Sequence, residues 1–350
     1  MAATFDVSPE KEGSILNYLY RQLTHTPAEV SDVDLSGKTA IVTGSNVGVG
    51  LECGRQLLHL GLTKLILAVR NVSKGQTAAD ELSKGQSPKQ GSIEVWELDY
   101  SSYDSICSFV ERTKGLERLD IVILNAGIMT TAMRLNPNTG HEETIQTNYL
   151  STALLAILLL PVMKTKRLTT PQQPGRITIT SSDAAAWAKL NEKDENPLLP
   201  SFDRPGKVDM TNRTFVSKLL GQMFLVELAK RVPSSVAVIN AATPMMVYDS
   251  EISRDTARSL PGKIAEVFRR RIGYTAAVGA RMVVDAAVRH GEETHGQYLG
   301  LHKVKPMAPL VYLTEGERLR NLLWTETLEE FSFAGVDNIL KDIIEEHAGP

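Results

Sequence analysis

The feature that most constrains the fold is a repeated alternation between short apolar runs and longer segments with apolar residues at helical spacing. Strand-like runs lie within residues 39–50, 63–71, 92–102, 119–129, 175–182 and 234–244, with helical patterns between them, including residues 141–164 and 214–232. An alternation of this kind predicts a parallel sheet with right-handed crossovers. We therefore predict an α/β fold, a doubly wound, Rossmann-like sheet in a single domain.

A glycine-rich turn joins the first predicted strand to the helix after it. It comprises Thr43, Gly44, Ser45, Asn46, Val47, Gly48, Val49 and Gly50. Glycine is needed where the backbone approaches a phosphate closely, and the free N–H groups and dipole of a helix N-terminus attract pyrophosphate. The placement between strand and helix favours a dinucleotide site, and a purely structural turn is the alternative.

The second strand ends in a cation. Arg70 follows this strand, and Lys74 is nearby. An acidic residue there would accept hydrogen bonds from the ribose hydroxyls of NAD, whereas a cation suits the 2′-phosphate of NADP. We therefore predict NADP as the cofactor; a solvated arginine at a strand end is the alternative.

Polar residues also follow the third and fourth strands. Asp99 ends the third, and Asn125, Ala126 and Gly127 end the fourth. Ligands of open parallel sheets bind outside the carboxyl ends of the strands. These residues are therefore expected at the same edge as the glycine turn.

At this point the chain resembles a known family, the short-chain dehydrogenases/reductases, over residues 36–312. The resemblance rests on residues 43–50, the Asn125-Ala126-Gly127 motif, Asn148 in QTNYLS, Ser182 after the strand RITITS, and Lys218 in SKLLGQMF. The phrase LWTETLEEF and the long segment 187–213 resemble the retinol-dehydrogenase-like branch, which has many members in fungal secondary metabolism.

The resemblance implies a role for each residue. Asp99 would contact the adenine ring, and Asn125 would support the nucleoside side of the cofactor. Lys218 would hold the nicotinamide ribose hydroxyls and lower the pKa of a catalytic tyrosine. Ser182 would polarise the substrate carbonyl, and Asn148 would anchor a water linking Lys218 to solvent.

Two positions depart from the family pattern, both on the nicotinamide side. Thr214 stands where the Tyr-x-x-x-Lys signature, which ends at Lys218, has its tyrosine. Met245 stands where the family has a glycine after Pro244, which is kept as a cofactor-binding residue. A threonine cannot replace the tyrosine as an acid, because an aliphatic alcohol is far weaker than a phenol of pKa near 10.

Three functions fit this pattern. The first is an NADP-dependent oxidoreductase acting on a carbonyl or alcohol of a lipophilic small molecule, in secondary-metabolite biosynthesis. A water held by Ser182 and Thr214, or a substrate group, would then deliver the proton, at a cost of about 10²- to 10⁴-fold in rate. The second is a reaction without net redox, such as a dehydration, isomerisation or cyclisation. The third is an NADP-binding protein without catalysis. We favour the first.

Two other ionisable residues near these motifs are weaker candidates for the missing acid. We expect Asp183 to cap the chain or face solvent beyond its strand, and His141, in the turn-like NPNTGHEE, to lie on the surface. Cys53 and Cys107 lack metal-binding spacing, so no metal site is expected.

Composition agrees with a soluble cytoplasmic enzyme. The chain has 350 residues, a net charge of −3 and no arginine-rich tract, which argues against a nucleic-acid partner. The start lacks the pattern of a signal peptide, and the apolar run within residues 151–163 is too short to cross a bilayer. The oligomeric state is open, a homo-oligomer included.

Two helical extensions are predicted outside the main domain of residues 36–312. They cover residues 1–35 and 313–350, and the second is expected to pack against the body. Closing part of the substrate cleft, or joining a dimer interface, is the alternative for this tail. Between Ser182 and Lys218 lies a long polar loop, which must border the site. We expect Leu198, Leu199 and Phe202 in this loop to offer apolar contacts to a hydrophobic substrate.

Overall fold

A computed structural model describes residues 5–84, 92–169, 174–248, 267 and 269–345. Its centre is an eight-stranded sheet with the order β3-β2-β1-β4-β5-β6-β7-β8. The strands are β1 Thr39–Thr43, β2 Lys64–Val69, β3 Ser92–Glu97, β4 Ile121–Leu124, β5 Gly175–Thr180, β6 Ala237–Ala242, β7 Tyr298–Gly300 and β8 Lys303–Lys305. All neighbouring pairs are parallel except β7 and β8. The predicted doubly wound, Rossmann-like α/β fold is confirmed.

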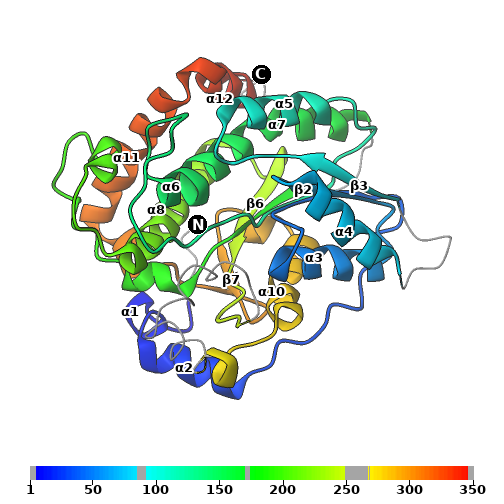
Figure 1. The fold of residues 1–350 in the computed structure, drawn as a ribbon, viewed down its shortest axis with the longest axis horizontal. Helices are drawn as coiled ribbons and strands as arrows, with labels where there is room; N and C mark the ends of the chain where they lie inside the picture. Colours follow the sequence, from blue (N-terminus) through cyan, green and yellow to red (C-terminus); the bar gives the residue numbers. More distant parts are fainter. Residues whose placement is uncertain (1–4, 85–91, 170–173, 249–266, 268, 346–350) are drawn as a thin grey trace.

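Helices cover both faces of the sheet (Figure 1). One face carries α3 Gly48–His59, α4 Val72–Ser83 and α10 Ala276–Val288, and the other carries α5 Tyr103–Thr113, α7 Ser151–Thr169 and α8 Met210–Arg231. Alternate residues of one strand serve the two cores: Ile41 packs with the second set of helices, and Ala40 and Val42 with the first. Since side chains alternate along a strand, a strand buried on both faces must be apolar throughout, as β1 is.

The strands β7 and β8 were not predicted from the sequence. Each has only three residues, which is too short for a periodic pattern to be recognised. Lys305 lies on β8 and, as described below, reaches a residue next to the predicted catalytic serine.

The apolar run within residues 151–163 was expected to be too short to cross a bilayer, but the helical segment that contains it, Glu143–Lys166, is long and apolar enough to span a membrane by length and composition. It comprises α6 Glu143–Ile145, a π-helical turn Gln146–Leu150 and most of α7. In the most apolar 18-residue window, 89% of the residues are buried inside the protein, so the segment serves here as a core helix.

Both chain ends carry helices. At the start are α1 Pro9–Glu12 and α2 Ile15–Thr24, and at the end are α11 Thr314–Glu330 and α12 Val336–Glu345. Trp324 of α11 stacks on Phe224 of α8 with ring centroids 5.8 Å apart, and Arg320 pairs with Glu227 at 3.0 Å. The tail therefore packs against the body, as its periodicity predicted.

The long loop before α8 corrects one expectation. Leu198, Leu199 and Phe202 do not offer a surface to a substrate; they are buried in the main core. Both carboxylate oxygens of Glu326 on α11 accept hydrogen bonds from the backbone N–H groups of Leu198 and Leu199. The tail helix thus fixes the loop from inside.

The expectation of a surface histidine is also wrong. His141 is 8% exposed, and its ring nitrogens lie 2.8 Å from a carboxylate oxygen of Asp203 and 3.1 Å from one of Glu330. Burial alone lowers the pKa of His141, but hydrogen bonds to the two carboxylates outweigh it and raise the pKa to about 9. The charged imidazole therefore bridges the loop and α11.

This bridge predicts a pH-dependent stability. Folding raises the pKa of His141, so protonated His141 stabilises the fold. This stabilisation is complete below the ordinary histidine pKa of 6.5 and is lost as the pH rises through about 9. In urea unfolding, we expect the free energy of unfolding of the wild type to fall by about 2–3 kcal/mol more than that of His141→Asn between pH 6 and pH 9.5. The exposed His59→Gln variant is the control; parallel pH curves for wild type and His141→Asn would refute the bridge.

Candidate active site

The turn between β1 and α3 is built around glycines. Gly44 and Gly48 have positive φ angles of 62° and 60°, which glycine adopts without strain. Gly50 is constrained by packing: a Cβ atom there would lie 2.4 Å from the carbonyl oxygen of Gly44 and 2.6 Å from Nδ2 of Asn125. The chain at this turn is as close to its neighbours as a backbone can come.

The N-terminus of α3 has no side-chain cap. Its N-cap residue is Val47, which makes no capping hydrogen bond, whereas Ser102 caps α5 and Asp209 caps α8. The hydroxyl of the nearby Ser45 donates to the carbonyl oxygen of Val42 at 2.8 Å. The first N–H groups of α3 are therefore left for an anion, as a pyrophosphate site requires.

Asn125 holds this turn against the end of β4. Its backbone N–H donates to Oγ1 of Thr43 at 2.9 Å, and its Nδ2 donates to the carbonyl oxygen of Thr43 at 3.2 Å. Its Oδ1 accepts from Thr180 at the end of β5. One side chain thus fixes the carboxyl ends of β1, β4 and β5 relative to each other.

Asn148 lies in the π-helical turn that precedes α7. Its side-chain amide pairs with both backbone polar groups of Ile128, at 2.8 and 3.0 Å. Its Nδ2 also donates to Oγ of Ser217 on α8 at 3.0 Å. A π-turn often marks a functional position in a helix, and here it brings the β4 end and α8 to one side chain.

Lys218 points from α8 toward the same place. Its Nζ donates to the carbonyl oxygen of Thr180 at 2.9 Å and would lie 3.8 Å from a Cβ on Gly127. Burial lowers the pKa of Lys218 to about 8. An ammonium held in this way is ready to exchange a proton near neutral pH.

Thr214 precedes Lys218 by one turn of α8, on the same face. The side chain is 5% exposed, and its hydroxyl donates to the carbonyl oxygen of Met210 at 3.0 Å. That bond uses the only proton of the hydroxyl, so Thr214 can offer a water or substrate only an acceptor.

Ser182 follows β5, two residues after Thr180. Its Oγ accepts a hydrogen bond from the N–H of Ala184 at 3.2 Å, and the residue is partly exposed. The hydroxyl proton is thus available to a carbonyl oxygen. Lys218 and Asn148 therefore meet at the carboxyl ends of β4 and β5, beside the segment that carries Ser182.

The predicted adenosine-side residues lie further along the same edge. Arg70 follows β2 and is exposed, and Asp99 follows β3. A carboxylate oxygen of Asp99 accepts from the N–H and hydroxyl of Ser101 at 2.9 and 2.8 Å, which fixes its orientation. Which contacts these residues make to a ligand stays a prediction.

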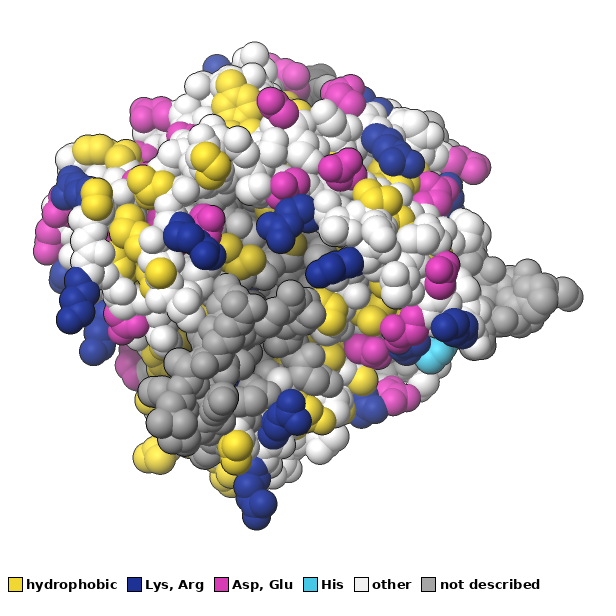
Figure 2. Space-filling view, viewed as in Figure 1, with side chains coloured by type: hydrophobic (Ala, Val, Ile, Leu, Met, Phe, Trp, Pro, Cys, Tyr) yellow, Lys and Arg dark blue, Asp and Glu magenta, His cyan; other side chains and the backbone are white. Residues whose placement is uncertain are grey.

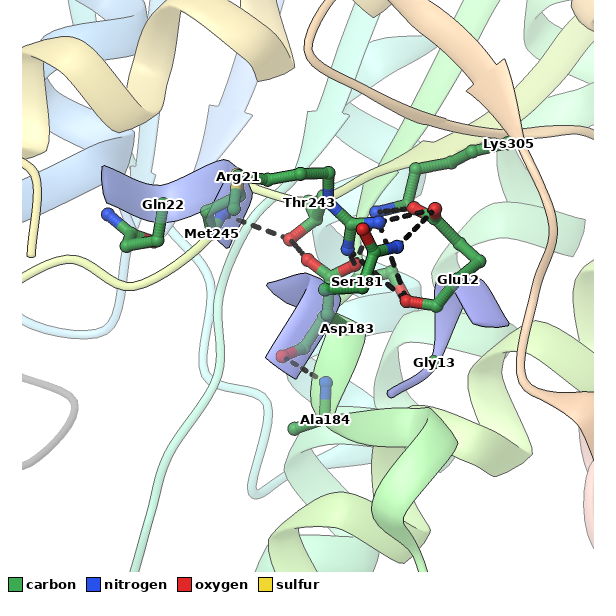
Figure 3. Close-up of polar contacts among 12 residues, drawn as sticks. Glu12, Gly13, Arg21, Gln22, Ser181, Asp183, Ala184, Thr243, Met245 and Lys305 are labelled. Atoms are coloured by element: carbon green, nitrogen blue, oxygen red, sulfur yellow. Dashed lines mark hydrogen bonds and ion pairs between the residues drawn. The ribbon is translucent and has the colours of Figure 1, made fainter. Parts of the chain in front are cut away.

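Asp183 departs from expectation, since it neither caps nor faces solvent. It is 9% exposed and lies in a buried cluster of four charges, with Glu12, Arg21 and Lys305 (Figure 3). Its carboxylate pairs with Lys305 and accepts from the hydroxyl of Thr243 at 2.8 Å. Burial alone raises the pKa of Asp183, but the neighbouring cations outweigh this and lower it, so Asp183 stays a carboxylate.

The pairing of these four charged residues was not predicted from the sequence. Its four members come from α1, from α2, from the segment after β5, and from β8. Glu12 and Lys305, which pair directly, lie near opposite ends of the chain. No spacing pattern links them. The only signal was two acids and two bases in otherwise ordinary segments, which a single sequence cannot pair.

The loop after β6 carries the second departure from the family pattern. Met245 has a φ of 55°, a left-handed conformation that favours glycine. Its N–H donates to Oγ1 of Thr243 at 3.0 Å, and the side chain is buried against Tyr18 and Met282. The backbone shape of a glycine is thus kept at this position although the residue is not glycine.

A cavity of about 400 Å³ lies at the opposite edge of the sheet, at the amino ends of β1, β4 and β5. Its lining includes Lys38, Arg118 and Arg176. Parallel α/β sheets bind their ligands at the carboxyl ends, so this cavity is separate from the candidate site.

Comparisons with known proteins agree with this arrangement. A family described as short chain dehydrogenase matches residues 38–191. The short-chain dehydrogenase fogG of Aspergillus ruber is 46% identical over 98% of this chain and 99% of its own. The short chain dehydrogenase virL of Hypocrea virens is 37% identical, also over 98% of this chain and 99% of its own. The chain therefore belongs to the short-chain dehydrogenases, a family of oxidoreductases.

Solved structures show the same fold. A 3-oxoacyl (acyl-carrier-protein) reductase from Agrobacterium tumefaciens with NADP bound has a TM-score of 0.56 and 19% identity, and covers 76% of this chain and 93% of its own. A putative NAD(P)-dependent gluconate 5-dehydrogenase from Beutenbergia cavernae, with bound NADP, has a TM-score of 0.53 and 20% identity, over 77% of this chain and 96% of its own.

Proposed function

We propose that this protein is an NADP(H)-dependent oxidoreductase that interconverts a carbonyl and an alcohol on a lipophilic small molecule. The observation that carries the proposal is one sheet edge that joins an uncapped helix N-terminus to Asn148, Lys218 and the neighbouring Ser182. An anion site beside a polarising hydroxyl and an ammonium is what a nicotinamide dinucleotide and a carbonyl need. A role in secondary metabolism is part of the proposal, and two relatives of this chain, fogG and virL, are fungal short-chain dehydrogenases.

Each part of NADP has residues at this edge of the sheet that suit its chemistry. The N–H groups of α3 and the glycine turn would hold the pyrophosphate, and Arg70, with Lys74 on α4, would hold the 2′-phosphate. Two solved structures with this fold hold NADP. Asp99 would lie on the adenine side, and Pro244 on the nicotinamide side.

Bound NADPH would supply the hydride. Ser182 would donate a hydrogen bond to the carbonyl oxygen and polarise it. Two other ionisable residues that the structure describes do not supply the proton: Asp183 stays ionised, and His141 is engaged by two carboxylates in a bridge to α11. We assign this proton to Lys218, through a water, because burial lowers its pKa to about 8. Thr214 would accept a hydrogen bond from that water.

One observation favours a second candidate, an NADP-binding protein without turnover. Thr214 at the predicted tyrosine position and Met245 after Pro244 both lie on the nicotinamide side, whereas the glycine turn and Asn125 keep the family pattern. Loss of catalysis with binding kept would give this distribution. The two candidates differ in turnover and agree on the cofactor.

Calorimetric titration of the purified protein with NADPH and with NADH tests the shared part. We expect tight binding of NADPH and weaker binding of NADH. Arg70→Ala should raise the Kd for NADPH by about 10- to 100-fold and leave NADH unchanged, since a charged hydrogen bond contributes about 1.5–3 kcal/mol. Lys341→Ala, an exposed cation on α12, is the control. If neither nucleotide binds at millimolar concentration, both candidates fall.

A further inference from the structure

The helix α2 lies against the two loops that follow β5 and β6, far from its neighbours in sequence (Figure 1). Gln22, only 3% exposed, accepts at Oε1 from the N–H of Met246 at 3.0 Å, and its Nε2 donates to the carbonyl oxygen of Met246 at 3.4 Å. A side-chain amide thus pairs with the loop backbone as a neighbouring strand would. The loop that carries Pro244 is therefore fixed from outside the main domain.

The buried charge cluster fixes α2 to the other loop (Figure 3). Arg21 lies 3.6 Å from Asp183 and also pairs with Glu12, and Lys305 lies 2.9 Å from Glu12. Two acids and two bases balance in a site nearly closed to water. Removing one partner would leave a buried charge uncompensated, so the cluster ties α2 to the segment after β5.

An aromatic row runs from α2 to α8. Tyr18, 6% exposed, meets Trp187 edge-on with ring centroids 5.0 Å apart, and Trp187 meets Phe215 at 5.9 Å. Trp187 is five residues after Ser182, and Phe215 follows Thr214. The indole N–H of Trp187 donates to the carbonyl oxygen of Gly13 at 2.8 Å, which orients the ring.

This row is separate from the two sheet cores. Tyr18 packs in a small cluster with Met245 and Met282, and Trp187, Met246, Tyr274 and Leu301 are partly exposed beside it. Burial and the carboxylate of Asp183 raise the pKa of Tyr18 well above its ordinary value, so its phenol stays protonated. Tyr18 is thus an apolar ring with a hydrogen-bond donor, and it does not replace the acid missing at position 214.

We propose that α2 is a wall of the substrate site and that Tyr18, with Trp187, makes the site selective for planar aromatic carbonyl compounds. The inference rests on the proposed function and deepens it by naming a substrate class. Two neighbouring aromatic rings favour a flat aromatic ligand through edge-to-face and stacked contacts. The match to fogG covers 98% of this chain, which leaves at most about seven residues outside it, so nearly all of this N-terminal region is shared.

The test is a binding measurement on the full chain saturated with NADP⁺. The probes are 2-acetonaphthone and its fully saturated decalin counterpart, which have the same carbon skeleton and differ in planarity. We expect wild type to prefer 2-acetonaphthone. Tyr18→Leu, which keeps apolar volume at the site, should raise the Kd for 2-acetonaphthone by about tenfold and the Kd for the saturated ketone by less than about twofold. Tyr18→Phe should retain the preference.

Tyr20→Ala is the matched control, because Tyr20 lies on the same helix and is 61% exposed. Equal losses for both ketones, no loss in Tyr18→Leu, or no preference in wild type would overturn the inference. Binding is measured without turnover, so the two proposals can fail separately. A wild type that prefers 2-acetonaphthone through Tyr18 but never reduces it would uphold the wall and refute the reductase; reduction without an effect of Tyr18 would do the reverse.

Discussion

Replacing Thr214 with tyrosine should raise NADPH-dependent carbonyl reduction by about 10²- to 10⁴-fold, the range that a positioned general acid supplies. Position 214 lies one turn before Lys218 on the same face of α8, and the ammonium there would lower the pKa of a phenol. The measurement is the initial rate of NADPH oxidation with a panel of aryl ketones and aldehydes, with NADPH affinity measured in parallel.

Thr211→Tyr provides the control, since Thr211 is exposed on the first turn of α8. A gain in Thr214→Tyr alone would mean that the rest of the site is competent and that the tyrosine position was assigned correctly. If Thr214→Tyr folds, binds NADPH and gains nothing on any substrate, both the slow reductase and the inactive binder become untenable. A reaction without net redox would then be the better account.

Gly50→Ala should abolish cofactor binding at micromolar NADPH and destabilise the fold by about 3 kcal/mol or more. The new methyl group would meet the carbonyl oxygen of Gly44 at 2.4 Å, and backbone cannot move aside as a flexible side chain can. The turn would have to open, which displaces the N–H groups of α3 and breaks the clamp made by Asn125. Calorimetry with NADPH and urea unfolding measure the two effects.

The matched control is Gly221→Ala, a glycine inside α8 with no atom within 4 Å of the added methyl group. Alanine is the better helix former, so this variant should gain about 0.5–1 kcal/mol and bind NADPH normally. Equal effects at the two positions would show that helix propensity, rather than close packing of the turn, governs both.

The sequence by itself determined the sheet and the edge where the site lies. Apolar runs such as residues 121–124, followed by Asn125 and Gly127, define a strand and its polar end without knowledge of any partner. A Rossmann-like sheet follows, because each unit is local: strand, turn and helix lie within about 30 residues. The same locality explains why residues 43–50 could be recognised, since φ, capping and spacing are properties of neighbours in the chain.

The surroundings of these residues were outside the reach of the sequence. Asp183 was expected to cap the chain or face solvent, yet it lies among cations from α2 and β8. His141 was expected on the surface, yet it lies between Asp203 and Glu330. Leu198 was expected to contact a substrate and instead lies under α11. A charge, a ring or an apolar group can meet many partners at a distance, and the choice among them follows from how the whole chain packs.

The sequence therefore settled what depends on neighbouring residues: the strands β1 to β6, the glycine turn at Gly44 and the helix that carries Lys218. The tertiary structure alone decided which groups lose water and which partners they meet, including the contact of Tyr18 with Trp187, two residues far apart in the sequence. The physical reason is that backbone conformation is dictated locally, whereas desolvation and ion pairing depend on every segment that closes around a group.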